Sequence, residues 1–271
     1  MKQVIMMMLY IFLSHDVDWR KQGPSKEHIL ARSNRFENLE LEKIDSKNLY
    51  YNFPEIMDLE EQFGVRSTFF FRTHYENGNY LDYEEEITSL MNGNWEIGLH
   101  TDGSSIKSLD LIKKEKADLE ILTKKPIFGN RVHYLNFDDK LLSKLYQSGF
   151  TYDSTMKKYK DRISIDDMNY RKIDGIIEFP LTIMDTYLFT YLGATEKNIL
   201  DIFKETISTA MGSTNSEDTR IITLLWHDNV LKMRGGRKYK DILEFLTSEN
   251  NIKIKRGIDV VNIINRFNKK M

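Results

Sequence analysis

Two aspartates near the start of the chain, Asp16 and Asp18, are spaced so that their carboxylates could act together. They follow a strongly apolar run, and residues two apart on an extended segment point to the same side. Two like charges held this close repel each other unless a cation lies between them or one carboxyl is protonated. The pair therefore indicates a metal site, although aspartates beyond a strand are also common as exposed loop residues.

Further ionisable side chains come directly after other apolar runs of strand length. They are Arg72, His100, Arg131, His133, Asp153 and His227. In a parallel α/β barrel the residues that follow the strands share one rim, where active sites are built. His and Asp are suitable ligands for Zn²⁺ or a similar divalent ion. The alternatives are a surface or hydrogen-bonded role for His100 and a capping role for His227.

The runs that must position these residues have the length of buried parallel strands. They alternate with segments of helical period to the end of the chain, which is typical of repeated βα units. The predicted strands are residues 4–13, 67–71, 95–99, 127–132, 149–152, 175–179 and 221–226, with 252–255 as a weaker last member. The predicted helices are residues 54–63, 83–91, 109–122, 138–147, 196–211, 239–247 and 258–267.

Seven or eight such strands could close into an α/β barrel or form an open, doubly wound sheet. The open sheet is disfavoured because no glycine-rich phosphate loop follows any strand. No Pro/Ser-rich linker, low-complexity tract or repeat divides the 271 residues. We therefore predict a single domain over residues 1–271.

The composition limits which classes of partner and which metal ligands the protein can have. The 39 Lys and Arg residues nearly balance 41 Asp and Glu residues, which argues against nucleic acid or an anionic membrane and suits a neutral sugar. Without cysteine, a metal must bind His, Asp, Glu or hydroxyl oxygen. The apolar run at residues 4–13 has no cleavage site after it and is too short to cross a bilayer. We expect a soluble, cytoplasmic protein.

Five short motifs, in order along the chain, resemble those of the polysaccharide deacetylases, also called NodB-homology proteins or family 4 carbohydrate esterases. The motifs are residues 14–18 (Ser-His-Asp-Val-Asp), 100–104 (His-Thr-Asp-Gly-Ser), 129–134 (Gly-Asn-Arg-Val-His-Tyr), 152–155 (Tyr-Asp-Ser-Thr) and 225–227 (Leu-Trp-His). The resemblance is greatest to a branch with His-Asp-Val-Asp and Arg-x-His-Tyr motifs. It implies a distorted (β/α)7 barrel.

The resemblance also implies a ligand set. By the first motif, Asp16 is the catalytic base and Asp18 a metal ligand, and by the second motif His100 is another ligand. The family usually has a further histidine where this chain has Ser104, and it has proline where this chain has His133. His133 is therefore the favoured third ligand, with Ser104 or water as the other choice.

The remaining motifs imply the other catalytic roles. Arg131 would hold Asp16 ionised and oriented through a charge-assisted contact. His227, steadied by Asp153, would protonate the departing amine.

The reaction implied is hydrolysis of an N-acetyl group on an amino sugar or polysaccharide, with a divalent metal for which Zn²⁺ is the first choice. Two other functions stay open: hydrolysis of a small amide such as a ureide or imide on the same barrel, and carbohydrate binding without catalysis. Three aromatic residues beside the proposed catalytic positions could stack on a sugar or simply pack in the rim and core. They are Trp19, Tyr134 and Trp226.

Overall fold

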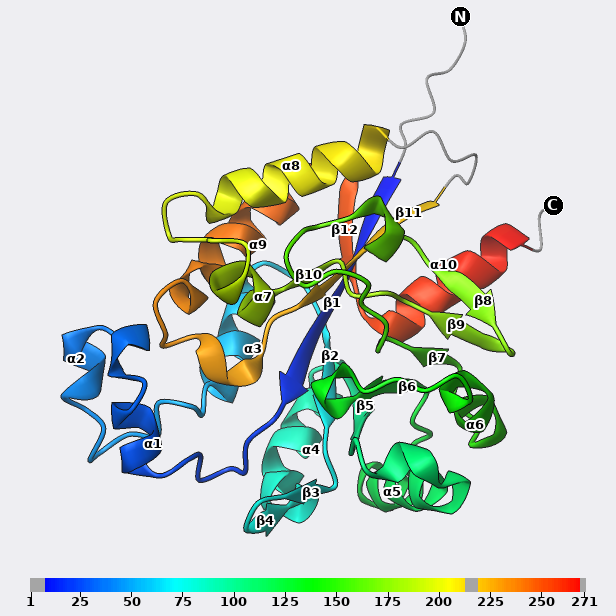
Figure 1. Cartoon of the computed structure of the whole chain (residues 1–271), viewed down its shortest axis with the longest axis horizontal. Helices are drawn as coiled ribbons and strands as arrows, with labels where there is room; N and C mark the ends of the chain where they lie inside the picture. Colours follow the sequence, from blue (N-terminus) through cyan, green and yellow to red (C-terminus); the bar gives the residue numbers. More distant parts are fainter. Residues whose placement is uncertain (1–7, 213–218, 269–271) are drawn as a thin grey trace, which may run out of the picture.

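The computed structural model describes residues 8–212 and 219–268 (Figure 1). A curled sheet of ten strands has the order β10-β11-β1-β2-β5-β6-β7-β9-β8, with β12 paired to β1. Its strands are β1 (Met8–Val17), β2 (Thr68–Phe71), β5 (Glu96–Thr101), β6 (Gly129–Val132), β7 (Tyr152–Asp153), β8 (Arg171–Ile173), β9 (Ile176–Glu178), β10 (Ile183–Met184), β11 (Thr219–Leu225) and β12 (Ile252–Lys255). A separate hairpin joins β3 (His74–Tyr75) and β4 (Gly78–Asn79).

Every pairing in the large sheet is parallel except that of β8 with β9. The eight predicted strands all correspond to strands of this sheet, although their ends differ. The first predicted strand begins outside the described residues, and it continues to Val17 instead of ending at residue 13. Asp16 therefore belongs to the strand itself.

Helices surround the curled sheet (Figure 1). They are α1 (Lys26–Leu30), α2 (Asn38–Leu41), α3 (Phe53–Gln62), α4 (Glu84–Asn92), α5 (Leu109–Thr123), α6 (Leu141–Gln147), α7 (Asp185–Thr190), α8 (Ile199–Gly212), α9 (Tyr239–Ser248) and α10 (Gly257–Asn268). The seven predicted helices are confirmed, whereas the short α1, α2 and α7 were not predicted. Within the described ranges, no helix has both the length and the apolar character needed to cross a membrane.

The alternation of side chains along β1 decides which of its residues reach the site. Leu9, Ile11 and Leu13 lie in the main hydrophobic core, between the sheet and the helices around it. Phe12 points the other way, into an inner aromatic cluster with Phe70. Because side chains alternate along a strand, Ser14 and Asp16 share the inner side with Phe12.

The inner cluster needs glycine on neighbouring strands. A Cβ atom on Gly98 of β5 would lie 2.5 Å from the ring of Phe70, and one on Gly129 of β6 would lie 2.2 Å from Tyr152. Only glycine therefore leaves room for these rings. The aromatic rings fill the inside of the curled sheet below the level of Asp16, so Asp16 lies above them, near the carboxyl ends of the strands.

Candidate active site

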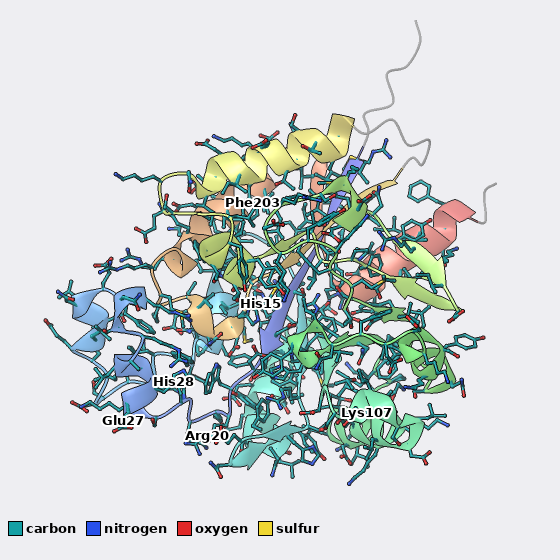
Figure 2. All side chains as sticks on the ribbon, in the orientation of Figure 1. His15, Arg20, Glu27, His28, Lys107 and Phe203 are labelled. Atoms are coloured by element: carbon teal, nitrogen blue, oxygen red, sulfur yellow. The ribbon has the colours of Figure 1, made fainter. Side chains whose placement is uncertain are left out.

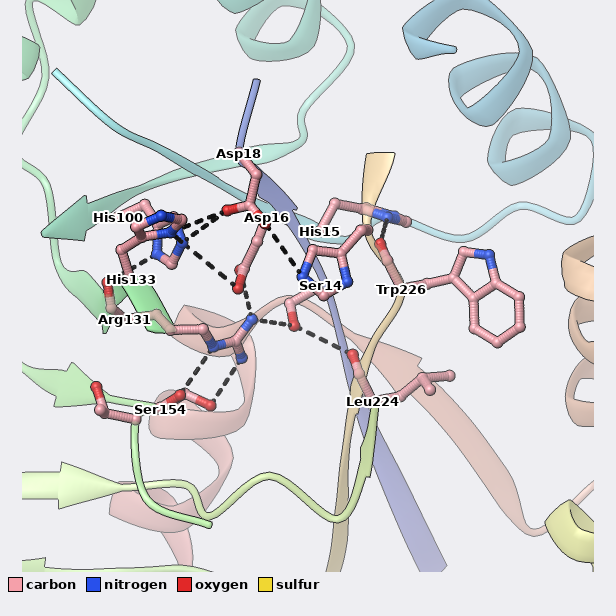
Figure 3. A network of polar contacts seen from close by, with 12 residues as sticks. Ser14, His15, Asp16, Asp18, His100, Arg131, His133, Ser154, Leu224 and Trp226 are labelled. Atoms are coloured by element: carbon pink, nitrogen blue, oxygen red, sulfur yellow. Dashed lines mark hydrogen bonds and ion pairs between the residues drawn. The ribbon is translucent and has the colours of Figure 1, made fainter. Parts of the chain in front are cut away.

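Three groups suited to binding a metal meet near the carboxyl ends of β1, β5 and β6 (Figure 3). His100 Nε2 lies 3.1 Å from Asp18 Oδ1, and His133 Nδ1 lies 3.2 Å from the same oxygen. The two imidazole nitrogens are 3.2 Å apart. One carboxylate and two imidazoles form a ligand set that fits Zn²⁺ or a similar divalent ion.

Hydrogen bonding fixes the protons in this cluster. His100 Nδ1 lies 3.0 Å from the main-chain oxygen of Arg131, which can only accept, so a neutral His100 donates there and presents a lone pair at Nε2. Burial lowers the pKa of His133 against the opposing effect of Asp18. Burial alone would raise the pKa of Asp18, but its contacts with His100 and His133 hold that pKa well below the ordinary value. The cluster thus joins a carboxylate of lowered pKa to two imidazoles, a set of groups that suits a cation.

The predicted contact between Asp16 and Arg131 is present. Arg131 is fully buried, and its Nη1 donates to Asp16 Oδ1 at 2.8 Å and to Ser14 Oγ at 2.9 Å. Its Nε and Nη2 donate to the main-chain oxygen and the hydroxyl of Ser154, both at 2.8 Å. The other oxygen of Asp16 lies 3.8 Å from His100 Nε2. Arg131 therefore fixes one carboxylate oxygen and leaves the second facing the candidate metal ligands (Figure 3).

His227 reaches the same cluster from the end of β11. Its Nε2 lies 3.5 Å from Asp18 Oδ2, and its Nδ1 lies 2.7 Å from Asp185 Oδ1. The main-chain N–H of His227 also donates to Asp185 Oδ2 at 2.7 Å. Burial would lower the pKa of His227, but Asp185 outweighs it, with Asp18 and Asp16 adding to the effect, and raises the pKa to about 10. Asp185 therefore holds the His227 ring in place and favours its protonated form.

The prediction that Asp153 steadies His227 is wrong. Asp153 is buried one layer below, where it accepts hydrogen bonds from Asn130 at 2.7 Å and from Thr155 at 2.9 Å. Asp185 was missed because β10, the strand that delivers it, has only two residues. The signal in the sequence was the short apolar stretch at residues 181–184 directly before Asp185, which has the same pattern as the longer strands.

Two other predicted site residues lie elsewhere. Ser104 is exposed, and its hydroxyl donates to Asp102 Oδ1 at 2.9 Å; no contact in the described parts of the chain joins it to Asp18 or His100. Trp226 is fully buried and stacks on Tyr239, so the prediction that it contacts the substrate is wrong. Strand alternation explains this, because the residue before His227 must point away from the rim.

A cavity of about 560 Å³ opens beside the cluster. Asp18 and His133 form part of its wall, together with Trp19, Tyr134 and His28. Tyr134 is 82% exposed and lies over the His133 ring, with the ring centroids 3.9 Å apart. His28 of α1 also belongs to this wall (Figure 2). The predicted positions of Trp19 and Tyr134 are thus beside the candidate metal ligands.

Asp228 is a second acidic residue that the sequence analysis missed. Its side chain is buried, and its Oδ1 has no hydrogen-bond partner within the described ranges. Burial raises the pKa of Asp228 well above the ordinary value, and the nearby charges of Asp18 and Asp16 act in the same direction. A neutral carboxyl group next to His227 is consistent with two ionised carboxylates already present in the cluster.

Several solved structures have a fold similar to that of this chain. A Mycobacterium smegmatis protein assigned to the polysaccharide deacetylases has a TM-score of 0.66 and 14% identity, over 99% of this chain and 94% of its own. The peptidoglycan deacetylase PdaC from Bacillus subtilis has a TM-score of 0.53 and 13% identity, over 97% and 95%. BA3943 from Bacillus anthracis, described as a carbohydrate esterase family 4 pseudoenzyme, has a TM-score of 0.51 and 12% identity, over 92% of this chain but 64% of its own.

No protein-family model matches the sequence, and no curated protein matches it at a significant level. At identities of 12–14% the likeness to the solved structures concerns the fold. The curled, mostly parallel sheet and the helices around it correspond to the fold predicted from the five motifs. The chain has the NodB-type α/β barrel fold of the polysaccharide deacetylases.

Proposed function

We propose that this protein is a metal-dependent hydrolase that removes N-acetyl groups from an amino sugar or polysaccharide. The observation that carries the proposal is the convergence of Asp18, His100 and His133, whose acceptor atoms face one another at 3.1–3.2 Å. Two further pairs flank this cluster, Asp16 with Arg131 and His227 with Asp185. Their placement supports a base on one side and an acid on the other.

Asp18, His100 and His133 would hold the ion, which when bound supplies Lewis-acid chemistry toward an amide carbonyl and a water molecule. Asp16 acts as the general base, because its free oxygen faces this cluster. Arg131 stabilises the charge of Asp16 and fixes its orientation, since the guanidinium is itself anchored on three other oxygens.

His227 acts as the general acid toward the departing amine. Its Nε2 faces the cluster, and its Nδ1–H is bound to Asp185, which holds the ring in one orientation. A positioned acid of this kind contributes about 10²–10⁴-fold to the rate. Asp185 does not contact the reacting atoms and is a positioning residue.

The cavity beside the cluster supports a sugar substrate. Trp19 and Tyr134 present aromatic rings on its wall, and such rings can stack on the apolar face of a sugar. The solved structures with this fold include a protein named as a peptidoglycan deacetylase. They also include one named as a pseudoenzyme, so carbohydrate binding without catalysis is the second candidate function.

The first experiment measures metal content and turnover together. We expect the purified protein to bind one zinc ion and to release acetate from N-acetylglucosamine oligomers faster than it hydrolyses ureides or imides to the corresponding acids. His227→Ala should retain zinc and lose about 10²–10⁴-fold in kcat. His133→Ala should lose zinc as well as turnover, because a ligand is removed.

The matched control is His74→Ala, because His74 is an exposed histidine on β3 whose ring is hydrogen-bonded to Thr73 and has no other polar contact within residues 8–212 and 219–268. This variant should keep both zinc and turnover. Zinc content that is equally absent from the native protein and from His133→Ala, even after zinc is added, would overturn the metal-dependent proposal. Retained zinc with no turnover on any amide would favour carbohydrate binding without catalysis.

A further inference from the structure

A second and larger cavity, of about 730 Å³, lies beside the candidate active site. Its walls come from Asn34 and Arg35, from α7, from residues 194–197 and from residues 230–236. Asp185 belongs to its wall, while its partner His227 contacts Asp18 on the wall of the smaller cavity. The pair formed by His227 and Asp185 therefore stands between the two cavities.

Both carboxylates on the wall of the larger cavity are neutralised by partners of their own. Asp185 is paired with His227 at 2.7 Å. Glu196 accepts from Arg237 Nη2 at 2.7 Å and from the main-chain N–H of Gly235 at 3.2 Å. Neither carboxylate is available to balance additional positive charge in the cavity.

Three cations on the same wall have little or no such compensation. Arg35 and Lys197 make no ion pair within residues 8–212 and 219–268. Arg234 is paired with Glu37 through its Nε, at 3.3 Å, and its two terminal nitrogens make no hydrogen bond within the described parts of the chain. The chain as a whole has a net charge of −2, so this excess of positive charge is local to the cavity. Such a cavity attracts anions.

The rest of the lining suits the ring of an organic ligand. Phe189, Val230 and Met233 supply apolar surface, and Thr190 and Thr195 supply hydroxyl groups. A mixed lining of this kind binds a ligand that has an apolar face, several hydroxyls and a charged group. An acidic sugar has all three features, whereas a free inorganic anion would leave the apolar part of the wall unused.

Arg35 also links the two cavities electrostatically. Its charge contributes, after burial and with Arg32, to lowering the pKa of His28, which lines the smaller cavity. Segment 19–35 thus forms wall for both cavities. A substrate of two or more sugar units could place its acetylated unit next to Asp18 and a neighbouring unit next to Arg35.

We propose that the larger cavity is a substrate subsite for a sugar unit that carries an anionic group, and hence that the substrate is an acidic glycan. The anionic group can be a phosphate or a carboxylate, because Arg and Lys bind both. This inference rests on the proposed deacetylase function for its place in catalysis, but the binding itself can be measured without turnover.

The first test compares the binding of glucose 1-phosphate, glucuronic acid and glucose to the zinc-loaded full chain by calorimetry at low ionic strength. We expect at least one of the two acidic sugars to bind about tenfold more tightly than glucose, and the advantage to decrease with added salt. The more tightly bound acidic sugar identifies the anionic group. Equal binding of all three sugars would overturn the proposal.

The second test removes the three cations. The triple variant Arg35→Gln, Lys197→Gln and Arg234→Gln should bind acidic sugars about tenfold more weakly and glucose unchanged, since these exposed side chains contribute little to folding. Lys107→Gln is the matched control, because Lys107 is exposed, lies near α5 and has no ion pair in the described ranges (Figure 2). An equal loss in the control would overturn the assignment.

Kinetics separate this proposal from the proposed function. If both hold, an acidic unit next to the acetylated sugar lowers KM about tenfold in the native protein, and the triple variant loses that advantage at constant kcat. Tight binding of acidic sugars without turnover would retain the subsite and overturn the deacetylase. Turnover with equal KM for acidic and neutral oligomers would retain the deacetylase function and overturn the anionic subsite.

Discussion

Two histidine–carboxylate clusters lie on opposite sides of β1: His15 with Glu60, and Asp18 with His100 and His133. They differ in whether each polar atom has a hydrogen-bond partner within the protein. His15 lies 2.5 Å from the main-chain oxygen of Trp226 through Nδ1 and 2.8 Å from Glu60 through Nε2, so each ring nitrogen has a hydrogen-bond partner. Glu60 also accepts from Ser67, Trp95 and Tyr239. Both His15 and Glu60 are fully buried.

In the cluster of Asp18, His100 and His133, the hydrogen-bond donors and acceptors do not match. The only N–H of a neutral His100 is already donated to a main-chain oxygen, and three acceptor atoms then face one another. One proton can join two of them but not all three. The same residue types therefore build a structural network where donors and acceptors match, and a candidate metal site where they do not.

The largest expected effect on the free energy of unfolding is at the His15–Glu60 network. Glu60→Ala leaves His15, Ser67, Trp95 and Tyr239 without their common acceptor, and breaking a buried pair of this kind costs about 3–5 kcal/mol. Urea denaturation of the zinc-free protein should show this loss. The control is Glu61→Ala, since the Glu61 side chain is largely exposed and, among the described residues, forms an ion pair with Arg66 alone. A loss below about 1 kcal/mol would show that the network does not stabilise the fold.

The next largest effect is the gain in stability from zinc at the cluster of Asp18, His100 and His133. Zinc at 100 times its Kd should raise the free energy of unfolding of the native protein by about 2.7 kcal/mol, because the ion binds only the folded state. His100→Ala should abolish this gain, measured as the zinc-dependent shift in the urea midpoint. His74→Ala should retain the full gain. A gain that persists in His100→Ala would place the ion elsewhere.

A smaller effect on stability is expected at the pair formed by His227, the proposed general acid, and Asp185. Asp185→Asn keeps a hydrogen-bond acceptor but removes the charge that raises the pKa of His227 to about 10, and should cost about 1–2 kcal/mol at about pH 6. Because the folded pKa is raised, the stabilisation is complete below about pH 6.5 and is lost as the pH rises toward 10. The difference between native and variant free energies, measured in EDTA, should therefore shrink between about pH 6.5 and about pH 10. A difference that grows with pH would contradict the ion pair.

The smallest effect on stability is expected at the cavity mouth. Tyr134→Ala removes an exposed ring and should change the free energy of unfolding by less than about 0.5 kcal/mol. If Tyr134 stacks on the sugar, KM for the oligomer should rise severalfold while zinc binding is unchanged. An unchanged KM would leave Tyr134 as a packing residue for His133.

Sequence patterns predicted the strands and most of the rim residues because long apolar runs and their polar ends are local features. Asp16, Asp18, His100 and His227 follow such runs and do meet in space. Asp185 could not be predicted in the same way, since a two-residue strand has no periodicity.

Side-chain alternation was the other source of error. Trp226 is next to His227 in the chain, but alternation along the strand sends its ring into the core. His15 is separated from Asp16 by the same rule, and for it the sequence alone contains no sign of the distant acceptor Glu60. Partners that lie far apart in the chain depend on the packed fold, so only the structure reveals which histidines are already satisfied.

The pairing of β1 has a consequence for how the site forms. One edge of β1 pairs with β11 from Met8 to Ser14, and the other edge pairs with β12 from Leu9 to Phe12 and then with β2 from Ser14 to Val17. Most of its partners thus come from the last quarter of the chain. Such distant pairings are slow to form, because a long loop must close first. During synthesis, β1, which carries Asp16 and leads directly to Asp18, waits for residues 219–255 to leave the ribosome, and the rim is assembled late.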